Sequence, residues 1–68
     1  MPLVIVVAWL PDDGWGVQVV EAAGVLVEQG GYPSALVAMD AGQVWVTLHR
    51  PGVPCITEVH APPDGVAL

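Results

Sequence analysis

Apolar residues run without interruption from Leu3 to Leu10, and Pro2 and Pro11 bound the run on both sides. The run is rich in β-branched residues and too short for a helix of ordinary length, so it predicts a strand. Successive side chains of a strand point to opposite faces, and both faces of this strand are apolar. Such a strand is expected where a sheet is covered on both sides.

The segment from Val17 to Gln29 has a different period. As a strand, the segment does not alternate between apolar and polar residues. As a helix, with 100° between successive residues, its four polar side chains fall within one arc and most apolar side chains lie opposite. This pattern predicts a helix over Val17 to Gln29, although its valines and Gly24 have low helix propensity. In an alternative interpretation, Trp15 to Glu21 is the return strand of a hairpin and the whole chain is an all-β meander.

Three further strands are expected. Ala35 to Met39 and Val44 to His49 are short apolar runs, and the loop between them, residues 40–43, suits a hairpin. Cys55 to His60 alternates and follows a proline-rich turn, which indicates an edge strand.

The predicted fold class is therefore α+β, a β-α-β-β-β order with one helix on one face of a mixed sheet. A right-handed crossover through the helix would make the first two strands parallel. We expect a single compact domain over residues 1–60 and an irregular tail over residues 61–68.

Hydrophobic residues make up 54% of the chain and charged residues 12%, against about 25% charged in ordinary domains. A domain of this size buries only about 60% of the surface that its unfolded chain exposes. Some of its many apolar side chains must therefore lie on the surface of a monomer. One helix covers only one face of the predicted sheet. Both arguments predict a homo-oligomer or a protein partner, with Trp9, Trp15 and Trp45 as candidate interface residues.

Seven acidic residues oppose one cation, Arg50, and the formal net charge is −6. This charge repels phosphate backbones and anionic lipids, so neither direct nucleic-acid binding nor membrane binding is expected. Asp12, Asp13 and Asp40 lie in predicted turns and are the candidate acidic contacts for a basic partner.

The predicted function is therefore that of a small acidic protein-protein interaction module. Its leading form is an inhibitor of a basic nucleic-acid-handling protein, of the antitoxin or anti-CRISPR type, whose carboxylates occupy the place of phosphates. A structural subunit of a phage or another multi-subunit particle is the alternative, because it explains the apolar excess equally well.

His49, Cys55 and His60 are the candidates for a metal site or a nucleophilic pair. Structural zinc takes four ligands, usually with two close in sequence, and this spacing offers three. Cys55 and His60 also point to opposite faces of the predicted last strand. Glu58 and His60 share a face, and beside Trp45 of a neighbouring strand they would form a minimal acid-base site without a nucleophile. We expect no metal, no cofactor and no enzymatic activity.

Met1-Pro2 followed by a strand and a helix in so short a chain resembles the tautomerase superfamily in outline. In that family the initiator Met is lost, the proline nitrogen is the catalytic base, and small β-α-β subunits form oligomers. The resemblance covers Pro2, the length and the first two elements, and it implies an enzyme with Pro2 as its base. The family binds carboxylate substrates through arginines, whereas this chain has only Arg50. A tautomerase-like enzyme is thus the enzymatic alternative.

The single cysteine cannot form a disulfide within one chain. The sequence shows no secretory signal pattern, and its longest apolar run is far shorter than the roughly 18 to 20 residues that span a bilayer. These features predict a cytoplasmic protein.

Overall fold

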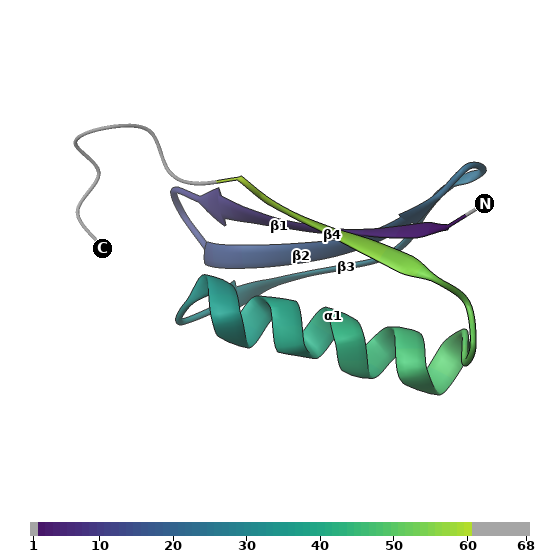
Figure 1. Cartoon of the computed structure of the whole chain (residues 1–68). Helices are drawn as coiled ribbons and strands as arrows, with labels where there is room; N and C mark the ends of the chain where they lie inside the picture. Colours follow the sequence, from purple (N-terminus) through teal and green to yellow (C-terminus); the bar gives the residue numbers. More distant parts are fainter. Residues whose placement is uncertain (1, 61–68) are drawn as a thin grey trace.

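The computed structural model describes residues 2–60, which form four strands and one helix (Figure 1). The elements follow the order β1 (Leu3–Leu10), β2 (Gly14–Glu21), β3 (Gly24–Tyr32), α1 (Ala35–His49) and β4 (Cys55–His60). The strands form one mixed sheet in the order β3-β2-β1-β4, and α1 lies along one face of it. The α+β class, with one helix and a mixed sheet, is confirmed. The tail predicted over residues 61–68 lies outside the described residues.

The strand β1 is central and pairs on both sides. It is antiparallel to β2 and parallel to β4, so β4 lies at an edge as expected. Leu3, Ile5 and Val7 point toward α1 and are almost fully buried, whereas Val4 and Val6 on the opposite face are only half-buried. Within residues 2–60 the apolar strand predicted at Leu3 to Leu10 is therefore covered on one face, not on both.

The helix predicted over Val17 to Gln29 is wrong, because this segment forms most of β2 and β3. A tight turn joins the two strands, with Gly24 at a φ of 137° that L side chains rarely adopt. The hairpin brings Gln18 opposite Glu28, and the Gln18 amide donates a hydrogen bond to the Glu28 carboxylate. The polar residues that seemed to form one helical arc thus include a cross-strand pair. The return strand at Trp15 to Glu21, from the alternative interpretation, is right, and it pairs antiparallel with β1. The parallel strand that was expected after the helix, at Ala35 to Met39, does not form.

The helix α1 occupies the segment in which two strands and a hairpin were expected, so those two strands are wrong, and so is the all-β meander. Ser34 stands at the N-cap in extended conformation, and its Oγ accepts a hydrogen bond from the Val37 N–H at 3.2 Å. At the other end, the Arg50 N–H donates to the Val46 carbonyl at 2.7 Å. These caps satisfy backbone groups that a helix end otherwise leaves unpaired.

The contact between α1 and the sheet depends on small side chains. Ala38, Gly42 and Val46 recur at intervals of four residues on the buried side of α1. A Cβ atom at Gly42 would lie 2.8 Å from Ile5 Cγ2 and 3.0 Å from Val17 Cγ2. The absence of a side chain at Gly42 therefore allows the helix to approach β1 and β2 closely.

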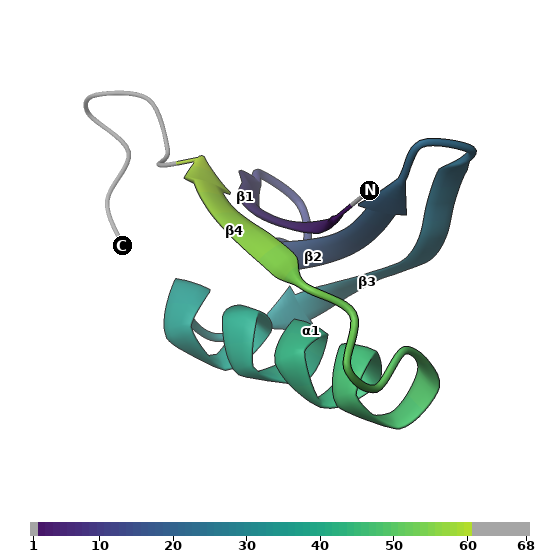
Figure 2. The same cartoon turned by 45° about the vertical axis from the view of Figure 1, so that its right-hand side comes forward.

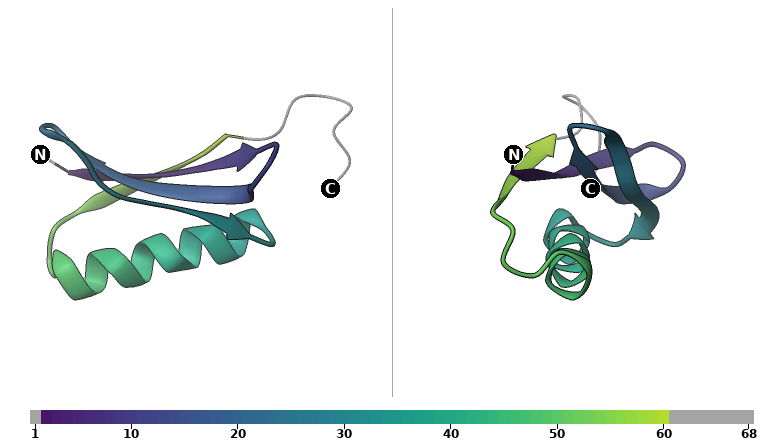
Figure 3. Two further views of the ribbon diagram at one scale, coloured as in Figure 1. Left: turned by 180° about the vertical axis from the view of Figure 1, so that it is seen from behind. Right: turned by 90° about the vertical axis from the view of Figure 1, so that its right-hand side faces the viewer.

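The chain reaches β4 from β3 through α1, so the helix connects the two edges of the sheet across one face (Figure 2). Viewed from behind and along its length, the curved sheet has α1 on one side, and no described element lies on the other (Figure 3). Within residues 2–60, no helix has both the length and the apolar character needed to cross a membrane.

Candidate functional site

The sheet face opposite α1, here called the open face, presents its side chains in rows that run across the strands. Register places neighbouring residues of adjacent strands side by side on the same face. One row is entirely apolar and consists, from β3 to β4, of Val25, Val20, Val4 and Ile56. Its outer members are well exposed, Val25 at 54% and Ile56 at 53%. One part of the open face therefore presents apolar surface to solvent.

The adjacent row carries acidic groups at both ends. Glu28, Gln18, Val6 and Glu58 lie side by side from β3 to β4. The strand spacing places the backbones of Glu28 and Glu58 roughly 14 Å apart, with Val6 and Gln18 between them. The Glu58 Oε1 lies 3.6 Å from His60 Nε2, and both side chains are exposed. Exposed pairs of this kind contribute little to stability, so the carboxylates remain available to a ligand.

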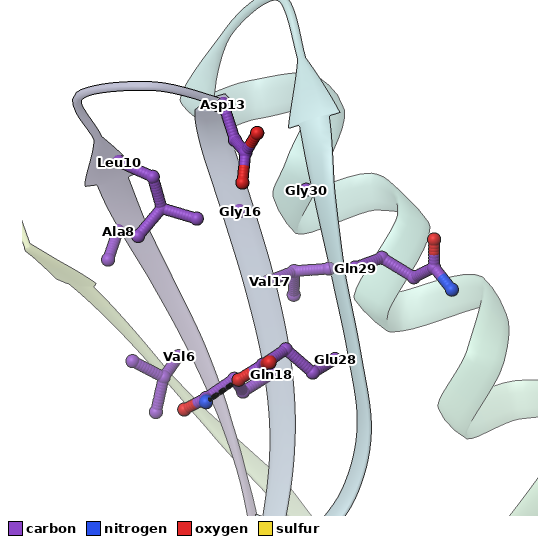
Figure 4. A pocket seen from close by; sticks show the side chains of 10 residues that line it. All are labelled: Val6, Ala8, Leu10, Asp13, Gly16, Val17, Gln18, Glu28, Gln29 and Gly30. Atoms are coloured by element: carbon purple, nitrogen blue, oxygen red, sulfur yellow. Dashed lines mark hydrogen bonds between the residues drawn. The ribbon is translucent and has the colours of Figure 1, made fainter.

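A hollow of about 270 Å³ lies between the acidic row and the β1–β2 turn (Figure 4). Gly16 of β2 lies beside Ala8 of β1, and together they form the floor of the hollow, because neither residue has a side chain large enough to fill it. A Cβ atom at Gly16 would lie only 2.7 Å from Leu10 Cδ1, and one at Gly30 would lie 3.4 Å from the Asp13 Cβ. Leu10 and Asp13 thus border the space that the two glycines leave open. The hollow is smaller than the roughly 300–1,000 Å³ of most small-molecule pockets, which suits a single inserted side chain.

The candidate acidic residues do not share one surface. Asp12 and Asp13 are exposed in the β1–β2 turn, as expected, and the Asp13 N–H donates to the Leu10 carbonyl at 3.1 Å. Asp40 is exposed on α1, across the sheet from the open face, rather than in a hairpin turn. Glu28 and Glu58 were not singled out as acidic contacts. Alternation over Cys55 to His60 placed Glu58 with His60, but the position of Glu28 depended on recognising β3 as a strand.

The three tryptophans lie on the helix side of the sheet. Trp15 belongs to the buried core, and Trp9 packs against it edge to face with ring centroids 5.7 Å apart. Trp45 lies on α1, half-buried against the same core, with its ring centroid 4.5 Å from that of His49. The aromatic candidates therefore pack against the core on the helix side, and the apolar surface of the open face comes from valine, isoleucine and Leu10.

The candidate metal ligands are separated by the fold. His49 lies at the end of α1, while Cys55 and His60 point to opposite faces of β4, as alternation predicted. The Cys55 Sγ lies 3.9 Å from Gln43 Oε1 on α1. Across the described part of the chain, no group of three His, Cys, Asp or Glu residues is placed to hold a metal ion.

The proposed acid-base site is also divided. Glu58 and His60 are paired on the open face, but Trp45 lies on the helix at the other side of the sheet. The outline shared with the tautomerase superfamily weakens as well, because the first strand is followed by a second strand and not by a helix. Pro2 is exposed beside β1.

No protein-family model, no curated protein and no solved structure matches this chain, so its function must be argued from the geometry of the open face.

Proposed function

We propose that this protein is an acidic protein-interaction module that binds a basic partner protein on its open face. The observation that carries the proposal is the combination of an exposed apolar row with flanking carboxylates on a face that α1 leaves uncovered. The chain contains no Lys, and its single Arg follows α1 on the other side of the sheet. Within residues 2–60, the open face therefore carries no Lys or Arg that would repel a basic partner.

The two parts of the open face would contribute different components of binding. Burial of the apolar row against a partner provides affinity in proportion to the apolar area removed from water. The carboxylates steer the encounter and set its orientation, because electrostatic complementarity acts mainly on association rate and specificity.

The hollow suits the side chain of an Arg or Lys residue from that partner. Its apolar stem would pack over Ala8, Gly16 and Leu10, and its charged head would lie near Asp13 or Glu28 at the rim. A guanidinium bound to a carboxylate makes stronger hydrogen bonds than a neutral pair, and its fixed geometry adds specificity.

A basic nucleic-acid-handling protein is the partner class that the charge favours. Such a protein binds phosphates through Lys and Arg, and carboxylates on the open face would occupy those positions. The protein would then act as an inhibitor of the antitoxin or anti-CRISPR type. The alternative, a structural subunit of a larger particle, is favoured by the additional exposed apolar residues on α1, among them Leu36 and Leu48.

The test begins with affinity capture from the native source, with the wild-type chain and its Ile56→Asp variant as baits. The association rate of the captured partner is then measured at increasing salt. We expect a basic partner that is lost with Ile56→Asp and whose association slows steeply as salt screens the charges.

A triple variant, Asp13→Asn, Glu28→Gln and Glu58→Gln, tests the acidic residues directly. We expect slower association and a weaker salt response, whereas the single-charge control Asp40→Asn, on the opposite side of the sheet, should change both much less. Equal rates and equal salt response for the triple variant and the wild type would refute the role of the carboxylates. A salt-insensitive complex with a non-basic protein would favour the structural subunit.

A further inference from the structure

The outer edge of β4 is a regular sheet edge. β4 pairs with β1 in unbroken register from Cys55 to His60, and within residues 2–60 no strand lies beyond it (Figure 2). At the other edge of the sheet, the pairing of β3 with β2 shifts register twice, and Gly31 has a φ of 85°. Irregularities of this kind protect a sheet edge from pairing, so β4 is the edge that can accept another strand.

The backbone groups of β4 divide between its two sides. The Leu3 N–H donates to the Pro54 carbonyl at 3.0 Å, so the even-numbered residues of β4 bond to β1. Backbone groups alternate along a strand, and the odd-numbered residues, Cys55, Thr57 and Val59, therefore direct their N–H and C=O groups away from the sheet. Within residues 2–60 no backbone group pairs with them. A row of this kind is suited to bind the backbone of another extended chain.

The helix does not cover this edge. α1 packs mainly over β2 and β1 and reaches β4 through Gln43. The Gln43 Nε2 lies 3.5 Å from the Thr57 hydroxyl, and its Oε1 lies 3.9 Å from the Cys55 Sγ. Both contacts use side chains on the helix side of β4, so the outward backbone groups stay accessible.

The side chains of β4 indicate which kind of strand fits. Ile56 and Val59, on opposite faces of β4, are about half exposed, and side chains of an added strand would cover both. Glu58 lies on the open face between Ile56 and His60, its side chain is 54% exposed, and β4 has no Lys or Arg. A cation beside Glu58 would complete a cross-strand pair of opposite charges. The strand that fits is therefore apolar with an Arg or Lys near its middle.

We propose that an extended segment of the basic partner joins the sheet as a fifth strand beside β4, with an Arg or Lys next to Glu58 and an apolar residue next to Ile56. The proposal rests on the proposed function, which supplies the basic partner. Main-chain hydrogen bonds give such a strand its affinity, and the side chains give it specificity. A second copy of the chain fits this edge less well, because it carries a formal net charge of −6.

Amide hydrogen exchange of the isotope-labelled full chain, followed by NMR, tests the edge. In the free protein the N–H groups of Thr57 and Val59 should exchange fast, and those of Ile56 and Glu58, which donate to β1, should exchange slowly. The probe is a peptide with blocked ends, Thr-Val-Thr-Arg-Val-Thr, added at millimolar concentration. We expect it to slow exchange at Thr57 and Val59. Equal protection of both sets without the peptide, or no effect of the peptide on β4, would overturn the proposal.

A proline on the edge tests the backbone pairing. Thr57→Pro removes one outward N–H and keeps the bonds to β1, since proline is tolerated on an edge strand where the N–H faces solvent. It should abolish binding of the peptide, whereas the matched control Thr57→Val, which also lacks the hydroxyl, should bind like the wild type. Circular dichroism checks folding. If Thr57→Pro does not fold, the peptide methylated at every N–H provides the test and should not bind the wild type. Binding in either case would refute strand addition.

The charge of the added strand is tested with Glu58→Gln. Peptide binding should weaken by about two- to fivefold, the effect of one cross-strand pair of opposite charges. The matched control is Glu21→Gln at the end of β2, which should bind the peptide like the wild type. Equal binding by Glu58→Gln and the wild type would refute the position of the basic residue.

The partner captured with the wild-type chain separates this inference from the proposed function. We expect Thr57→Val to retain the partner and Thr57→Pro to lose it. If both variants retain it equally, the open face binds without the edge, and strand addition is wrong. If the peptide binds β4 but no basic partner is captured, the edge site is confirmed and the proposed function is wrong.

Discussion

Gly42 determines how closely α1 lies against the sheet. The atoms that a Cβ at this position would meet are γ-methyl groups of Ile5 and Val17, and β-branched side chains have few rotamers in which to move aside. In most helices a glycine costs about 1 kcal/mol relative to alanine. Alanine at position 42 would therefore improve helix propensity, but its Cβ would prevent the close approach of the helix to the sheet, and this loss opposes the gain.

We therefore expect Gly42→Ala to lower the free energy of unfolding by about 1–3 kcal/mol, the usual cost of overpacking a core, despite the better helix propensity of alanine. Urea denaturation followed by circular dichroism measures the change. Thr47→Ala, on the exposed side of the same helix, is the control and should be neutral or slightly stabilising. A Gly42→Ala protein more stable than the wild type would show that Ile5 and Val17 move aside at little cost and that the close approach at Gly42 is not needed for stability.

Among the elements, α1 depends most visibly on one local interaction. Ser34 is followed by a segment with four β-branched residues in fifteen, so the helix does not have strong propensity throughout. The Ser34 Oγ pairs with an N–H of the first turn, which otherwise has no partner within the helix.

Ser34→Ala should cost about 0.5–2 kcal/mol of stability, and Ser34→Asp should restore most of it, because aspartate is as good an N-cap as serine. The measurement is the thermal unfolding midpoint of the wild type, Ser34→Ala and Ser34→Asp, compared at one protein concentration. Equal loss with Ala and Asp would mean that Ser34 acts through packing and not through its hydroxyl.

The first and last strands along the chain, β1 and β4, were predictable from sequence, and the segments between them were not. Prolines bound β1 and precede β4, and the alternation of β4 is clear. In contrast, the polar side of α1 is a narrow stripe of Asp40, Gln43 and Thr47, and apolar residues such as Val44 and Leu48 are exposed beside it, so the helical period is weak in the sequence. The β2–β3 turn at Ala22-Ala23 lacks the usual Asn-Gly or Asp-Gly signal of a hairpin. The local indications of the helix were Ser34 before it, and His49 followed by Pro51 and Gly52 at its end.

The candidate site could be predicted only in part for a related reason. Asp13 was found because turn chemistry is local, and the Glu58–His60 pair because it lies within one strand. Glu28, Gly16 and the hollow depend on the pairing of β1, β2 and β3, which brings together residues distant in sequence. Register of this kind is a property of the folded sheet and leaves little trace in the local pattern.

For the whole molecule, electrostatics is dominated by repulsion. Seven acidic residues face one arginine, and the acid–base contact within residues 2–60 is the exposed one between Glu58 and His60, which is an ion pair only when His60 is protonated. A net charge far from zero keeps a protein soluble but destabilises its compact state.

The free energy of unfolding should therefore rise when salt is increased from 0.01 to 0.1 M, as the screening length falls from about 30 to about 10 Å. Urea denaturation at fixed protein concentration provides the measurement. Asp40→Lys, which changes the net charge from −6 to −4, should show a smaller response. A stability that falls with salt would indicate that attractive pairs outweigh the repulsion.

The parallel pairing of β1 with β4 has a consequence for synthesis on the ribosome. β2 follows β1 almost directly, but β4 ends at His60, fifty residues after Leu10. At 5–20 residues per second, that interval lasts roughly 3–10 s. Throughout it, one edge of the most apolar strand in the nascent chain has no neighbour and is free to pair with strands of other chains. The yield of folded protein should therefore depend on translation speed and on chaperones that hold this edge until β4 emerges.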